Sequence, residues 1–157
     1  MSAESLLEAA RAKGVMVATA ESCTGGLLAG AITDPPGASA IFDRGFVTYT
    51  DEAKRDLLGV RPDTLRAHGA VSEAVAREMA AGALARSAAA VAVAVTGIAG
   101  PGGSGVKPEG RVCFGLAAGG EAWAETVEFG PRGRRAVREA SVAHALSLLL
   151  RAVARLP

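Results

Sequence analysis

The chain has 157 residues, of which 50% are apolar and 21% are charged, and its formal net charge is +1. This composition excludes a disordered chain, which would combine few apolar residues with a high net charge. The longest unbroken apolar run, residues 88–95, has eight residues, whereas a membrane-spanning helix needs about 20. So small a net charge provides no general attraction for nucleic acid.

The N-terminal part of the chain alternates helix and strand signals. Ser2 can cap a helix that Gly14 ends. The apolar run over residues 15–20 is typical of a buried strand. A helix is expected over residues 27–33, followed by a second strand over residues 45–50, which is rich in β-branched and aromatic residues.

Further helices are expected over residues 51–58, 62–68 and 134–155. Another helix is expected to begin after Ser72, which can cap it. Alternating Ala and Val over residues 89–96 indicate a central strand, and the Gly-rich stretch that follows cannot form regular structure. Strands over residues 111–118 and 122–129 flank Gly119 and Gly120, which is a hairpin signal. This order of elements predicts an α/β fold, a three-layer α/β/α sandwich with a mixed, mostly parallel sheet.

Length, cysteine content and the N-terminal residues indicate how many domains the protein has and in which cellular compartment it works. A length near 150 residues predicts a single domain over residues 1–157. The two cysteines form no CxxC motif, so neither a disulfide framework nor a metal site is expected. Glu4 and Glu8 lie where a signal peptide would be basic and then apolar. We therefore expect a cytoplasmic protein.

The first candidate for chemistry is Ser22, which lies where a strand passes into a helix and precedes two glycines. Backbone N–H groups at a helix start lack intrahelical partners, so a hydroxyl beside them can attack a carbonyl while they hold the oxyanion. The alternative is that Ser22 or Thr24 only caps the helix. Cys23 is a second candidate nucleophile, although a small buried thiol is the more usual role of such a residue.

A serine nucleophile needs a base, and three side chains are candidates. His68 precedes a glycine, as residues at helix ends do, and His144 lies beside an apolar helical stripe. For Lys54, an ordinary pKa of about 10.4 must fall by roughly three units before the amine is a useful base, and burial can cause this. Tyr49 could lie beside Lys54 and relay or orient a proton. The alternative is that Lys54 is a solvated helix residue.

Two segments are candidates for binding a ligand. The Gly-rich loop over residues 97–110 follows the expected central strand, and consecutive N–H groups in such a loop can bind an anion; the alternative is a surface loop. The last helix begins with Arg134, Arg135 and Arg138, and Arg132 precedes it. Cations at a helix N-terminus oppose the macrodipole, so either a bound phosphate compensates them or they form a solvated face.

Several motifs occur in order along essentially the whole chain: AESCTGG at 20–26, GFVTY at 45–49, EAK at 52–54, HGAVS at 68–72, TGIAGPGG at 96–103 and KPEG at 107–110. Together they resemble the CinA C-terminal domain family. The resemblance implies a three-layer α/β/α fold and the hydrolysis of nicotinamide mononucleotide to nicotinate mononucleotide and ammonia. Many relatives carry a further N-terminal domain with pyrophosphatase activity. Because residue 1 lies at the start of the amidase-like domain, we do not expect the pyrophosphatase activity of this chain.

The resemblance also implies roles for individual residues. Ser22 is expected to be the nucleophile, Lys54 the base and Tyr49 its assistant, while Arg134 is expected at the phosphate end of the substrate. N–H groups around residues 23–26 are expected to hold the oxyanion. The complete set of expected substrate-binding residues is Cys23, Thr24, Gly25, Gly26, Thr96, Gly97, Ala99, Gly100 and Arg134.

The expected partner is a small-molecule substrate, nicotinamide mononucleotide, rather than nucleic acid or a membrane, and the chemistry requires no metal or cofactor. A homodimer is compatible with an enzyme of this type, although the sequence does not reveal an interface patch. Two other functions stay open. One is a non-catalytic nucleotide-binding or interaction protein linked to competence or DNA damage, and the other is a serine amidase for another small amide.

Overall fold

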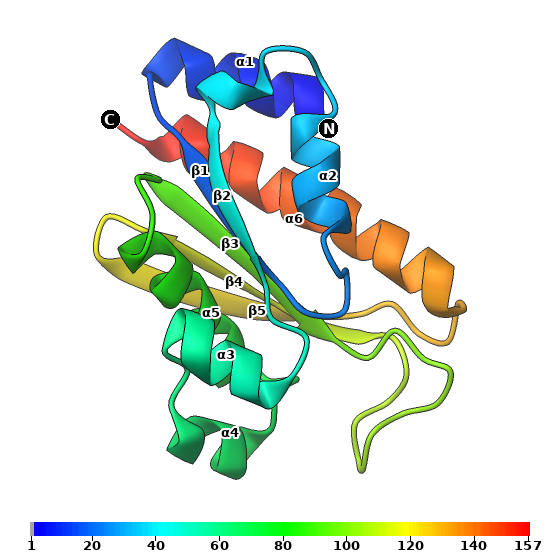
Figure 1. Ribbon diagram of the computed structural model, residues 1–157. Helices are drawn as coiled ribbons and strands as arrows, with labels where there is room; N and C mark the ends of the chain where they lie inside the picture. Colours follow the sequence, from blue (N-terminus) through cyan, green and yellow to red (C-terminus); the bar gives the residue numbers. More distant parts are fainter. Residues whose placement is uncertain (1) are drawn as a thin grey trace.

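Residues 2–157 are described by a computed structural model, in which five strands form one sheet (Figure 1). The strands are β1 (Val17–Glu21), β2 (Phe42–Val47), β3 (Val91–Gly97), β4 (Arg111–Ala118) and β5 (Glu121–Glu128). The helices are α1 (Ala3–Lys13), α2 (Leu27–Thr33), α3 (Asp51–Leu58), α4 (Pro62–His68), α5 (Glu73–Ala85) and α6 (Arg134–Arg155), with a 3₁₀ turn, η1 (Ala38–Ala40).

The sheet is mixed and has the order β2-β1-β3-β4-β5. Strand β1 pairs in parallel with β2 and β3, whereas β4 pairs antiparallel with β3 and β5. Four strands therefore run in one direction and β4 runs in the other. Helices α1, α2 and α6 cover one face of the sheet and α3, α4 and α5 the other (Figure 1). The predicted α/β fold with a mixed sheet is confirmed. Among residues 2–157, none of the helices combines the length and the apolar character that crossing a membrane requires.

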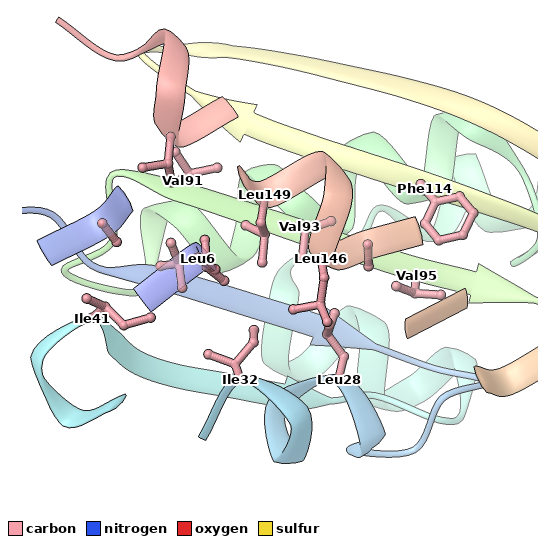
Figure 2. Packing of buried hydrophobic residues seen from close by; sticks show 14 of the residues in the cluster. Leu6, Leu28, Ile32, Ile41, Val91, Val93, Val95, Phe114, Leu146 and Leu149 are labelled. Carbon is pink, nitrogen blue, oxygen red and sulfur yellow. The ribbon is translucent and has the colours of Figure 1, made fainter. Parts of the chain in front are cut away.

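The alternation of Val and Ala in β3 gives the two faces of the sheet different cores. Side chains alternate between faces along a strand, so Val91, Val93 and Val95 point toward α1, α2 and α6 (Figure 2). Ala92 and Ala94 lie on the opposite face, in the cluster that contains residues of α3 and α5. The larger side chains fill the layer under α1, α2 and α6, and the smaller ones allow α5 to approach closely.

A glycine in β4 shows how close that approach is. A Cβ added to Gly115 would lie 2.1 Å from the carbonyl oxygen of Ala76 in α5. No side chain fits in this space, so α5 packs directly on the backbone of β4. The start of α5, capped by Ser72, is thereby held close to the sheet.

Strand β2 differs from its prediction, because it covers residues 42–47 rather than 45–50. The Thr50 side chain accepts a hydrogen bond from the N–H of Ala53 and caps α3, so the chain must leave the sheet before Thr50. Tyr49 therefore lies in a short link and not on a strand face. In α6, Val142 and Leu150 are only half-buried, and the residues with buried side chains are Val137, Ser141, Ala145, Leu146, Leu149 and Val153.

Candidate active site

A cleft of about 370 Å³ opens at the carboxyl ends of β1 and β3. The chain leaves β1 for β2 on one side and returns to β3 on the other, and ligands bind α/β sheets at such a switch point. The cleft is lined by Ser22, Cys23, Tyr49, Asp51, Lys54, Ala70, Val71, Thr96, Gly97, Ile98, Ala99, Gly100, Pro101, Gly102, Ser104 and Arg134.

Ser22 and Lys54 contact each other in this cleft. Lys54 Nζ lies 3.1 Å from Ser22 Oγ, and it donates to the carbonyl oxygens of Thr48 at 3.0 Å and Tyr49 at 3.2 Å. The N–H of Ser22 donates to Val95 O at 2.9 Å, which anchors the serine beside the end of β3. The N–H of Thr48 donates to Glu21 O at 2.8 Å and holds the β2–α3 link against the end of β1. The two side chains, 32 residues apart in sequence, are thus brought together by the parallel pair β1–β2.

Burial favours the neutral form of Lys54. The side chain is only 1% exposed, and among residues 2–157 no carboxylate forms an ion pair with it. Loss of hydration lowers the pKa of Lys54 below its ordinary 10.5, an effect that the negative charge of Asp51 partly opposes. The interpretation of Lys54 as a solvated helix residue is therefore wrong.

The hydrogen-bond partners of Lys54 match those of a neutral amine, which has two N–H donors and one lone pair. The carbonyls of Thr48 and Tyr49 can only accept, so they take the two N–H groups. When the amine is neutral, its lone pair faces Ser22 and the hydroxyl can donate to it; when it is protonated, the third N–H donates to Ser22 Oγ. Ser22 Oγ lies 3.5 Å from the Tyr49 carbonyl, at the limit of hydrogen-bond distance, so its hydrogen is available to the amine.

The start of α2 is capped by Glu21 and not by Ser22 or Thr24. The N-cap position is Gly26, which offers no side chain. Instead, the buried carboxylate of Glu21 accepts from the Thr24 hydroxyl at 2.6 Å and from the N–H groups of Gly26, Leu28 and Ala29 at 3.2, 2.9 and 3.0 Å. A negative charge here is stabilised by the helix macrodipole. The Ser22 side chain is thereby left to face the cleft.

The same turn determines which N–H groups remain free. The N–H of Gly25 donates to Ser22 O at 3.0 Å, and that of Gly26 donates to Glu21. Within residues 2–157, the N–H of Thr24 has no acceptor, and that of Cys23 faces only its own thiol. Of the four residues expected to bind substrate here, Cys23 lines the cleft, whereas Thr24, Gly25 and Gly26 do not.

Cys23 is a poor nucleophile in this position. Burial raises the pKa of its thiol from 9.0 to about 11, and the nearby Glu21 carboxylate adds to the effect, although a backbone hydrogen bond and the cation of Arg138 partly oppose it. Thiolates, not thiols, are the reactive species. Of the two adjacent candidates, Ser22 is the one with a base at hydrogen-bond distance.

Tyr49 and Arg134 form a second pair at the rim of the cleft. Tyr49 is 57% exposed, and its hydroxyl accepts from Arg134 Nη2 at 2.8 Å. Arg134 Nη1 donates to Gly100 O at 2.8 Å. The phenol therefore contacts Arg134, and it is the main-chain carbonyl of Tyr49 that contacts Lys54.

The other arginines of this region have different partners. Arg138 donates to the carbonyl oxygens of residues 23 and 24. Arg135 pairs with Glu139 on the exposed side of α6, and Arg132 lies over the ring of Phe129. None of these three lines the cleft.

The Gly-rich loop forms the opposite wall of the cleft. Thr96 Oγ1 donates to Ala70 O at 2.9 Å, and Gly97, Ala99 and Gly100 line the cleft as expected. Gly100 has φ +92°, and a Cβ there would lie 2.6 Å from the carboxyl carbon of Glu109. Glu109 Oε1 also accepts from the N–H of Gly102. The carboxylate of Glu109 therefore supports this wall from beneath.

Neither histidine lines the cleft. The carbonyl of His68 accepts from Lys107 Nζ, and the ring of His144 packs 4.5 Å from that of Phe114, with Nε2 3.5 Å from Glu125. Among residues 2–157, no group of three or more His, Cys, Asp or Glu side chains could hold a metal ion.

A larger hollow of about 530 Å³ lies between the β4–β5 hairpin and the end of α6. Its described lining is mainly apolar, with Trp123 and Leu148, and holds no Ser, Cys, Thr, His or Lys. A serine with a lysine amine at hydrogen-bond distance is found in the smaller cleft and not in this hollow.

Sequence reasoning missed Glu21 and Asp51, and it considered Arg138 only as a phosphate ligand or part of a solvated face. Glu21 and Arg138 hold the turn after β1, and Asp51 lines the cleft and acts on the pKa of Lys54. For Glu21, a signal was present, because a carboxylate directly between a buried strand and a helix start is suited to cap that helix. For Arg138, no local signal exists, since its contacts lie more than 110 residues away.

Comparison with known proteins gives consistent matches over nearly the whole chain. A family model described as "CinA C-terminal domain" matches residues 1–153. The nicotinamide-nucleotide amidohydrolase PncC of Escherichia coli (strain K12) is 50% identical over 147 residues, covering 93% of this chain and 89% of that protein. A CinA-like protein of Chloroherpeton thalassium is 52% identical over 131 residues, covering 80% of this chain but only 31% of that protein. The chain thus spans about a third of the length of such relatives.

The fold is also found in solved structures. A crystal structure of the competence/damage inducible protein CihA from Agrobacterium tumefaciens superposes with a TM-score of 0.87 at 51% sequence identity, covering 95% of each chain.

Proposed function

Because the chain belongs to the CinA C-terminal domain family, we propose that it hydrolyses the carboxamide of nicotinamide mononucleotide to nicotinate mononucleotide and ammonia. The name of the E. coli relative, which is similar over 93% of this chain, supports this substrate. The observation that carries the proposal is the buried amine of Lys54, 3.1 Å from the hydroxyl of Ser22.

In the first half of the reaction, the neutral amine of Lys54 takes the proton of Ser22 while Oγ bonds to the carboxamide carbon. The electron pair of the C=O bond moves to oxygen, and N–H groups of the turn after Ser22 hold the oxyanion, that of Cys23 being the one whose residue lines the cleft. When the oxyanion collapses, the C–N bond breaks. Ammonia leaves with the proton from the Lys54 ammonium, and an ester on Ser22 remains.

In the second half, water attacks the ester carbon while Lys54 takes a proton from it. The Ser22 oxygen then leaves and recovers that proton, and nicotinate mononucleotide is released. Tyr49 assists through its carbonyl, which orients the amine of Lys54. The scheme requires no metal or cofactor.

Arg134 and the Gly-rich loop are suited to the far end of the substrate. The Arg134 guanidinium lies at the rim of the cleft, away from the Ser22–Lys54 pair, and guanidinium groups bind phosphate well. Binding energy from a remote phosphate aligns the amide for attack. Free nicotinamide, which lacks ribose and phosphate, is therefore expected to be a much poorer substrate.

The test is ammonia release from nicotinamide mononucleotide by the purified protein. Ser22→Ala and Lys54→Ala should each abolish it while circular dichroism stays unchanged. Ser39→Ala, at an exposed serine of η1, is the matched control and should keep full activity. Full activity in either site variant would exclude the Ser22–Lys54 mechanism. Binding without ammonia release would favour a non-catalytic protein, and release from other amides alone would favour a different amidase.

A further inference from the structure

The candidate cleft carries opposite charges at two different places. Among the residues that the structure describes, three charged side chains line it, those of Asp51, Lys54 and Arg134. The neutral amine that the proposed reaction requires contributes no charge, so one negative and one positive group remain. Asp51 lies in the first turn of α3, next to the reactive pair, and Arg134 lies at the rim, where it donates to Gly100 O.

Asp51 lies beside the proposed base. It precedes Lys54 by three residues in α3, and residues at this spacing are neighbours on one face of a helix. Its negative charge acts on the amine, because it raises the pKa of Lys54 against the effect of burial. Since Lys54 Nζ lies 3.1 Å from Ser22 Oγ, the carboxylate of Asp51 is at the end of the cleft where the carboxamide must lie for attack.

The Asp51 carboxylate is exposed and forms no ion pair within residues 2–157. An acid in the first turn also stabilises a helix through the macrodipole, and this is the alternative role of Asp51. Glu52, the next residue, is an exposed acid of the same turn and does not line the cleft. The two acids therefore share the helical role and differ in whether they border the cleft.

The proposed substrate also carries opposite charges at its two ends. The nitrogen of its pyridinium ring is positively charged and bears the ribose, and a single ring carbon separates this nitrogen from the carbon that bears the carboxamide. When the carboxamide lies against Ser22 and Lys54, the cationic ring therefore lies at the Asp51 end of the cleft. The phosphate lies beyond the ribose, on the side that suits Arg134.

We propose that Asp51 is a specificity-determining residue, which selects the positively charged pyridinium ring over its neutral, reduced form. This inference rests on the proposed function, because the proposed reaction is what places the carboxamide at Ser22. The reduced nucleotide keeps the carboxamide, the ribose and the phosphate, and its dihydropyridine ring has lost only the positive charge. Opposite charges attract through water as well as in contact, so Asp51 acts on the ring without a hydrogen bond to it.

The expected effect is moderate, because the carboxylate is exposed to solvent. We expect Asp51→Asn to weaken binding of the oxidised nucleotide about fivefold, which corresponds to about 1 kcal/mol, the attraction of two unit charges about 4 Å apart in water. Binding of the reduced nucleotide should change by less than about twofold, because its ring has no charge to attract. Added salt should diminish the preference for the oxidised form, since salt screens exposed charges.

The experiment measures dissociation constants by isothermal titration calorimetry. The protein carries Ser22→Ala, so that neither nucleotide is hydrolysed, and it is compared with and without Asp51→Asn. The two probes are nicotinamide mononucleotide and its reduced form. Glu52→Gln in the same background is the matched control, and it should leave both dissociation constants unchanged because Glu52 does not line the cleft.

Several results would overturn the inference. If the Ser22→Ala protein binds the reduced nucleotide as tightly as the oxidised one, the cleft does not select a cation. If Asp51→Asn weakens both nucleotides equally, Asp51 maintains the shape of the cleft. If Asp51→Asn leaves the preference intact, or if Glu52→Gln removes it as well, the selection does not come from Asp51.

The result is separable from the proposed function. Ammonia release by the wild type tests the reaction, whereas the calorimetry needs only binding. If the wild type releases no ammonia but the preference is present and Asp51→Asn removes it, the proposed hydrolysis is wrong and the charge selection by Asp51 stands. If ammonia is released and the preference is absent, the reaction stands and this inference is wrong. If neither nucleotide binds, both proposals fall.

Discussion

Replacing Glu21 by glutamine tests how the turn after β1 is held. In the wild type, Glu21 Oε1 accepts three hydrogen bonds, from Thr24, Gly26 and Leu28, and Oε2 accepts one from the N–H of Ala29. If the glutamine amide keeps its oxygen at the Oε1 position, its NH2 group takes the Oε2 position. Two donors, this NH2 group and the N–H of Ala29, then face each other. At least one charge-assisted bond is then lost and a buried donor is left unpaired.

From these contacts we expect Glu21→Gln to lower the free energy of unfolding by roughly 2–4 kcal/mol. For a chain of this length, about 2–4 °C per kcal/mol corresponds to a fall in Tm of roughly 4–16 °C. Urea unfolding measures the first quantity and a thermal melt the second. Glu8→Gln, at an exposed glutamate of α1, is the control and should change neither. A Glu21→Gln protein as stable as the wild type would refute the view that this carboxylate holds the turn.

Further predictions concern the cleft. Because the amine of Lys54 must be neutral to act as a base, kcat/KM should rise with pH, with a midpoint below the ordinary pKa of 10.5. The negative charge of Asp51 raises the pKa of Lys54, so Asp51→Asn should move this midpoint to lower pH. A shift to higher pH would contradict this assignment. Cys23→Ala should keep most of the ammonia release, because the thiol, with its pKa raised to about 11, stays protonated at pH 7; its loss would point to a cysteine nucleophile. Arg134→Ala should mainly raise KM for nicotinamide mononucleotide, and an unchanged KM would remove Arg134 from the phosphate site.

The elements of the fold could be predicted where local signals mark both ends. The helices over residues 27–33, 51–58, 62–68 and 134–155 have the predicted bounds, since Pro, Gly and capping residues delimit them. Strand β2 was misplaced by three residues because Thr48 and Tyr49 suit a strand, whereas the cap of α3 at Thr50 draws them out of the sheet.

The site was only partly predictable, because its key contacts depend on the tertiary fold. The Ser22–Lys54 pair was suggested by family resemblance, whereas the sequence pattern left a solvated Lys54 as the alternative. The burial that lowers the pKa of Lys54 exists only in the folded structure. The free hydroxyl of Ser22 depends on Glu21 taking over the cap of α2. The contact between the Tyr49 phenol and Arg134 joins residues 85 positions apart, which no local pattern reveals.

The amine of Lys54 is anchored to main-chain oxygens at residues 48 and 49 rather than to their side chains. Every amino acid supplies that oxygen, so a substitution at the exposed position 49 keeps this acceptor for Lys54. The Tyr49 side chain, which projects at the mouth of the cleft, contacts Arg134 and not the reactive pair, so a change there alters the mouth of the cleft while the acceptor for Lys54 stays in the main chain. A library randomised at position 49 would explore substrate range on an unchanged catalytic base.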